Sequence, residues 1–135
     1  MTGKTIAYWA TTGLLSLAML ASGAAYLTGA MDEGMAHLGY PAHFIVLLGT
    51  WKLLVAPALL APGFAKLKEL AYAGLFFTLT GAAFAHAAVG DSVAEIAPPL
   101  VMLAMMLTSW ALHRTVRFGA ESGSTTSATP AAATA

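Results

Sequence analysis

Four long apolar stretches constrain what this chain can fold into more than any other feature of its sequence. They cover residues 6–27, 44–61, 70–89 and 96–112, and each has about 17–22 residues. A helix rises about 1.5 Å per residue, so each stretch matches the roughly 30 Å hydrocarbon core of a bilayer. An isolated strand would leave its backbone polar groups unpaired in lipid. The sequence therefore predicts an all-α fold, an integral membrane four-helix bundle.

The composition supports a membrane protein of one domain. Of the 135 residues, 59% are hydrophobic and only 9% are charged, whereas a soluble domain carries about 25% charged residues. The formal net charge is zero, so we expect the lipid bilayer and not nucleic acid as the partner. The chain has no cysteine, which excludes disulfides, thiol redox chemistry and thiolate metal sites.

The chain divides into a four-helix transmembrane domain over residues 1–118 and a tail over residues 119–135. The tail, "GAESGSTTSATPAAATA", has no large apolar side chain to bury, and we predict that it is disordered. The first apolar stretch has an alternative interpretation as a secretory signal peptide. The apolar part of such a signal has about 7–15 residues. The first stretch is longer, and its length favours a retained helix.

The basic residues predict the orientation. Lys52 apart, they flank the apolar stretches on one side only: Lys4, Lys66, Lys68, Arg114 and Arg117. The connections on the other side contain no Lys or Arg and four acidic residues: Asp32, Glu33, Asp91 and Glu95. Because basic residues are enriched in cytoplasmic loops, we expect both termini in the cytoplasm.

Three segments resemble the DoxX-like family of small four-helix membrane proteins. They are "HLGYP" at 37–41, "LGTWKLLVAPALLAPG" at 48–63 and "LKELAYAGLFFTLTGAAFAHAAVGD" at 67–91. The resemblance extends from about Tyr8 to Arg114 and implies a multi-pass protein of the bacterial inner membrane. Possible protein partners are other membrane subunits or further copies of this chain in a homo-oligomer.

The resemblance implies a possible quinone ligand but no set of catalytic residues. The family takes its name from a subunit of a thiosulfate:quinone oxidoreductase. A quinone reductase of similar four-helix architecture works through paired cysteines. This chain has no cysteine, so that chemistry does not carry over.

Lys52 is the principal candidate site residue, because it lies inside the second apolar stretch, in "GTWKLLVAPALL". A lysine at mid-membrane costs roughly 2.5–3.5 kcal/mol on insertion scales. Ionisable residues at such depth usually serve a function, and the alternative is a structural tie between helices. We expect the ammonium to face the bundle and to bond to His86 or Asp91.

Further candidates lie toward the same outer side. His86 and Tyr26 are near the outer ends of their stretches, and Asp91 follows His86 by five residues. Glu95 is explained by a capping box, "SVAE" at 92–95. The preceding "MDEGMAHLGYP" predicts a short interfacial helix ended by Gly39. No two histidines have the i, i+4 spacing of a helical metal site, and we expect neither a metal nor a haem motif.

Small residues predict where the helices meet, because small side chains let backbones approach closely in lipid. One stripe follows the third stretch and consists of Gly74, Thr78, Ala82 and Ala85. Gly49 and Ala56 flank Lys52 on the second stretch, and the first stretch contributes Thr12, Ser16 and Gly23. We expect all three sets to lie at helix contacts.

Two functional interpretations follow. The first is a redox-linked membrane subunit or small enzyme that binds a lipid-soluble molecule such as a quinone near Lys52, His86 and Tyr26. The second is a non-catalytic assembly or scaffold protein in which Lys52 fixes helix register. No nucleophile with an adjacent base and no phosphate-binding loop is visible, which argues against catalysis on soluble substrates.

The predicted orientation has a direct test. A reporter fused after Arg117 should be cytoplasmic, and one inserted between Asp32 and Ala36 should be external. The two ends of the chain on opposite sides of the membrane would contradict four spans.

Overall fold

The computed structural model describes residues 2–126. It contains five helices and, over those residues, no strand: α1 (Gly3–Leu27), α2 (Asp32–His37), α3 (Ala42–Leu60), α4 (Ala65–Ala88) and α5 (Val93–Thr126). Four of them are long and apolar enough to cross a membrane, namely α1, α3, α4 and the Val93–Arg117 part of α5. The all-helical fold and the four predicted spans are therefore confirmed.

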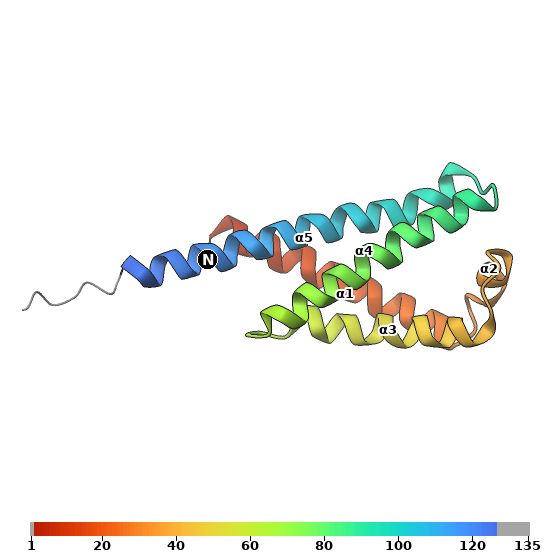
Figure 1. Cartoon of the computed structure of the whole chain (residues 1–135), viewed down its shortest axis with the longest axis horizontal. Helices are drawn as coiled ribbons and strands as arrows, with labels where there is room; N and C mark the ends of the chain where they lie inside the picture. Colours follow the sequence, from red (N-terminus) through yellow and green to blue (C-terminus); the bar gives the residue numbers. More distant parts are fainter. Residues whose placement is uncertain (1, 127–135) are drawn as a thin grey trace, which may run out of the picture.

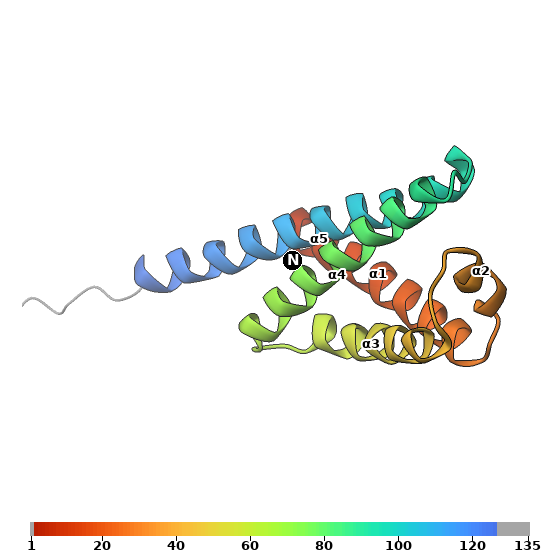
Figure 2. The same ribbon diagram turned by 45° about the vertical axis from the view of Figure 1, so that its right-hand side comes forward.

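The long helices alternate in direction. The start of α1, the turn between α3 and α4, and the far end of α5 lie at one end of the molecule (Figures 1 and 2). The opposite end holds α2 and the turn between α4 and α5. We call the second of these the outer end, following the orientation expected from the basic residues.

The helix boundaries follow local sequence signals. Thr2 caps α1 and Pro41 caps α3, which Pro does well because it lacks the N–H that a helix start leaves unpaired. The predicted short helix is α2, and Gly39 follows it with a φ of +84° that glycine adopts without strain. At the start of α5 the Glu95 carboxylate accepts from the Ser92 N–H at 2.9 Å, as the capping box predicts.

Two boundaries differ from the sequence prediction. Helix α4 begins at Ala65, so Lys68 lies within its first turn and not in a loop. Helix α5 continues to Thr126, so it extends past residue 112, where the fourth apolar stretch ends. The disorder of the tail stays a prediction. Residues 127–135 of that tail lie outside the described part of the chain.

The core lies between α1, α4 and α5, with a contribution from the end of α3. Its buried residues are Leu15, Met19, Leu59, Ala71, Tyr72, Leu75, Leu79 and Met106. Three hydroxyl groups within it are hydrogen-bonded to one another. Ser109 Oγ lies 2.7 Å from Thr12 Oγ1 and 2.8 Å from Tyr72 OH, so it joins α5 to α1 and α4. Bonding these hydroxyls to one another removes the cost of burying them in an apolar core.

The closest helix contact is between α1 and α3, at Gly23 and Gly49. A Cβ added at Gly23 would lie 2.9 Å from the Gly49 carbonyl oxygen, and one added at Gly49 would lie 2.9 Å from Tyr26 Cβ. The prediction that these two glycines mark a helix contact is confirmed. Gly74 was predicted to mark one too, and this is wrong, because a Cβ added there would meet nothing within 4 Å.

Helices α3 and α4 meet only near the turn that joins them. From that turn they diverge toward the outer end in both views (Figures 1 and 2). Gly63 in the turn has a φ of +80°, which permits the sharp reversal. The divergence leaves space beside Lys52 that no helix of the described chain fills.

The glycine contact makes a testable prediction. Gly49→Ala should lower the free energy of unfolding by about 1–3 kcal/mol, because α1 and α3 must separate to admit the methyl group. Gly74→Ala is the matched control and should be neutral or slightly stabilising, since alanine favours a helix over glycine. Denaturant unfolding of both variants in detergent measures the difference; equal effects would place the helix contact elsewhere.

Candidate functional site

Lys52 lies at the middle of α3 and points toward α1. It is ten residues from Ala42, the first residue of α3, which places it about 15 Å from the outer end of the helix at 1.5 Å per residue. Its ammonium donates to Ser22 Oγ at 2.7 Å and lies 4.0 Å from the centroid of the Tyr26 ring. A hydroxyl and an aromatic face thus replace part of the water that this cation would otherwise bind.

Helix α1 presents both of these groups to Lys52. Ser22 and Tyr26 are four residues apart, so they lie one above the other on the same helix face. The contact between Gly23 and Gly49 brings α1 close enough for the lysine side chain to reach them. The packing of two glycines therefore determines the surroundings of the cation.

A cavity of about 550 Å³ opens beside Lys52 at the outer half of the bundle. All five helices contribute to its wall, and α2 with its flanking residues lines it at the outer end through Met31, Met35 and Leu38. Lys52, His86 and Tyr26 all line it. The structure thus brings three of the four predicted site residues to one cavity.

A second cavity of about 750 Å³ lies between α3 and α4 and shares Lys52 with the first. It continues toward the inner end as far as Leu67 and Leu70. Lys52 is the one charged side chain in its wall, which is otherwise apolar apart from Thr78. Lys52 therefore stands at the junction of a cavity with polar groups and an apolar groove.

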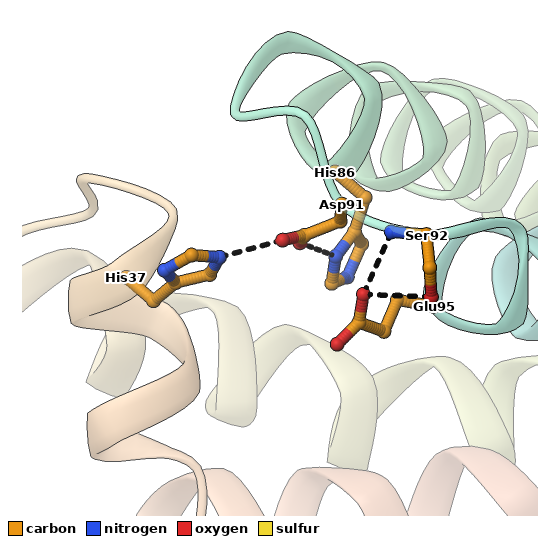
Figure 3. Close-up of polar contacts among 5 residues, drawn as sticks. All are labelled: His37, His86, Asp91, Ser92 and Glu95. Carbon is orange, nitrogen blue, oxygen red and sulfur yellow. Dashed lines mark hydrogen bonds and ion pairs between the residues drawn. The ribbon is translucent and has the colours of Figure 1, made fainter.

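Asp91 occupies a different position from the one expected. Its Oδ1 accepts from His37 Nε2 at 2.7 Å and its Oδ2 accepts from His86 Nδ1 at 2.6 Å (Figure 3). His37 belongs to α2, so one carboxylate connects α2 to the end of α4. The prediction that Lys52 bonds to Asp91 or His86 is wrong: its partner is Ser22, on α1.

Electrostatics strengthens the contact between α2 and α4. The hydrogen bonds from His37 and His86 lower the pKa of Asp91 below its ordinary value. The hydrogen bond to Asp91, with the nearby charges of Asp91 and Glu95, raises the pKa of His37. The bridge therefore favours an ionised Asp91 and a protonated His37. Over the described residues, no three or more His, Asp and Glu side chains are arranged to hold a metal ion.

Ser22 could not be singled out from the sequence. It is an ordinary helix serine, and the only available signal was its position one turn before Tyr26. A second cluster was missed at the other end of the bundle. Lys68 is 5% exposed and donates to Tyr8 OH at 3.0 Å, and His113 lies beside the rings of Tyr8 and Tyr72.

Comparison with known families agrees with this architecture. Residues 10–109 match the DoxX-like family. The chain belongs to the DoxX-like family. The matched region begins inside α1 and ends at Ser109 in α5, so it contains Lys52 and both cavities. No curated protein and no solved structure matches the chain. Family membership and the four apolar helices together make it a multi-pass membrane protein.

The bridge at Asp91 makes the stability of the outer end depend on pH. The pKa of His37 is raised in the folded protein, so its contribution is complete below about pH 6.5 and is lost as pH rises through the folded pKa. The pKa of Asp91 is lowered, so its contribution is present above about pH 4 and is lost as pH falls through the folded pKa. Both residues therefore contribute their full stabilisation between about pH 4 and about pH 6.5.

His37→Gln tests this window. The variant should melt below the parent at about pH 5.5, and the difference should shrink as the pH rises through the raised pKa of His37 in the folded protein. His43→Gln removes another exposed histidine and serves as the control. A melting difference for His37→Gln that stays constant from acid to alkaline pH would show that the charge plays no part.

Proposed function

We propose that this DoxX-like protein is a redox-linked membrane subunit that binds a lipid-soluble molecule, with a quinone as the leading candidate, in the cavity beside Lys52. The observation that carries the proposal is the joint presence of Lys52, His86 and Tyr26 on the wall of one cavity within the apolar part of the bundle. An intramembrane cation facing a cavity is typical of a ligand or ion site.

The three side chains have complementary roles in this proposal. The Lys52 ammonium donates a hydrogen bond to an oxygen of the ligand. Tyr26 holds the ammonium under its ring and offers a stacking surface beside it. His86 is bonded to Asp91 through Nδ1, which leaves Nε2 as the nitrogen that can exchange a proton with the cavity.

The dimensions of the cavity fit a small lipid-soluble ligand. Its volume of about 550 Å³ lies within the range of roughly 300–1,000 Å³ that is usual for such sites. Four methionines and four further aromatic side chains lie in the rest of the wall, and these adapt well to a flat ring. Access from the bilayer is through the space where α3 and α4 diverge.

The proposal includes a location and partners. The protein lies in the bacterial inner membrane with both termini in the cytoplasm, as the basic residues at the inner end favour. In this proposal electrons reach the ligand from another membrane subunit. A homo-oligomer is the alternative assembly.

One observation favours the second candidate function, a non-catalytic assembly protein. The hydrogen bond from Lys52 to Ser22 joins α3 to α1 at mid-membrane. A buried polar contact of this kind can have a purely structural role, in which it fixes the register of two helices. Under this alternative the lysine contributes to stability and the cavity has no specific ligand.

Quinone binding separates the two functions. Decylubiquinone should raise the melting temperature of the parent by mass action, and Lys52→Met should weaken the affinity about tenfold or more, as expected for loss of a charged hydrogen bond. Lys66→Met removes an exposed lysine from α4 and is the matched control.

Two results would contradict the quinone site. The first is equal binding by the parent and Lys52→Met. The second is a parent that binds no quinone while Lys52→Met unfolds more readily than Lys66→Met, which would support the structural tie. The compounds that co-purify with the parent, identified by mass spectrometry, provide an independent measurement.

A further inference from the structure

Lys52 has no acidic partner among the described side chains. Within residues 2–126 its ammonium contacts the hydroxyl of Ser22 and the ring of Tyr26, and both groups are neutral. Asp91, which is bonded to the cavity-lining His86, is engaged by His37 and His86 on its two oxygens. Among the side chains that the structure describes, no Asp or Glu forms an ion pair with Lys52.

An unneutralised ammonium at this depth is unusual. Intramembrane cations pair with acidic residues or backbone carbonyls in most proteins, because an isolated charge in an apolar medium is poorly solvated. Lys52 does neither: its hydrogen bond goes to a hydroxyl, and its other face lies against an aromatic ring. The described surroundings of the Lys52 ammonium therefore contain no neutralising group.

The two cavities that meet at Lys52 have different walls. The outer cavity has Ser22 and Tyr26 at the ammonium and His86 elsewhere in its wall. The second cavity runs from Lys52 past Leu54, Ala58 and Leu70, and its wall there is apolar. A molecule that fills both has a polar head at Lys52 and an apolar chain lying between α3 and α4.

We propose that the molecule bound at Lys52 is an amphiphile with an anionic headgroup, such as a carboxylate or an ionised hydroxyquinone on an alkyl chain. This inference rests on the proposed function and narrows its ligand class. The anionic oxygen accepts from the Lys52 ammonium and neutralises it, and the chain occupies the apolar groove. A neutral headgroup would accept the same hydrogen bond but would leave the charge unneutralised, so it binds more weakly.

Trp51 provides a local probe, because it lines both cavities next to Lys52. The double variant Trp9→Phe/Trp110→Phe leaves Trp51 as the single tryptophan. Both replaced residues lie in the inner part of the bundle, away from the two cavities that meet at Lys52. Bromine quenches tryptophan fluorescence on contact. Binding of a brominated amphiphile beside Lys52 is therefore measured as a decrease in Trp51 fluorescence.

The experiment compares a matched pair, bromoundecanoate and bromoundecanol, in phosphatidylcholine nanodiscs at about pH 8, where a carboxylic acid in solution is ionised. Both probes have the same chain and bromine, and they differ in headgroup charge. The acid should bind about tenfold or more tightly than the alcohol. Lys52→Met should abolish that preference, and Lys52→Arg, which keeps the charge, should preserve part of it.

The outcomes separate this inference from the proposed function. Equal quenching by the acid and the alcohol, or an acid preference that survives Lys52→Met, overturns the anionic headgroup. If decylubiquinone then still quenches Trp51 in a manner that depends on Lys52, the quinone site stands without it. If neither the acid nor decylubiquinone binds through Lys52, both proposals fail. Circular dichroism of each variant confirms that the helices are retained.

Discussion

The contact between Gly23 and Gly49 is the constraint on which the rest of the outer half depends. In lipid there is no hydrophobic gain when helices associate, so close backbone packing must supply the attraction. Each glycine removes a Cβ that would lie 2.9 Å from the opposing helix. With α1 and α3 this close, the Lys52 side chain reaches Ser22 and the Tyr26 ring. The same contact turns Lys52 toward the interior and away from lipid.

Polar contacts then position the remaining helices. Ser109 joins α1, α4 and α5 through two buried hydrogen bonds near mid-core, and Asp91 connects α2 to α4 at the outer end. No comparable contact joins α3 to α4 along the outer half of the described chain, and these two helices diverge there. The bundle is therefore closed on three sides and open on the fourth, which is where both cavities meet Lys52.

The candidate site was predictable in its location but not in its contacts. Lys52 stood out because a charge inside an apolar stretch is costly and therefore rarely accidental. His86 and Tyr26 were predicted from their depth in the membrane. The rise of a helix per residue gives that depth directly from the residue number. The partners were not predictable, because depth does not say which way a helix is rotated. Asp91 illustrates this: it has the right depth for Lys52, yet its oxygens point to His37 and His86.

The sequence by itself determined the four spans, their up-and-down order and the capping box at 92–95. These depend on the thickness of the bilayer and on hydrogen bonds between residues close in the chain, so local information is sufficient. Only the tertiary structure decided that Gly23 and Gly49 form the close contact while Gly74 faces open space. It also decided that Lys68 is buried against Tyr8 and that Lys52 meets Ser22. The physical reason is that these contacts depend on how each helix is rotated about its axis. The packing of all four helices together determines that rotation, and no single apolar stretch contains the information.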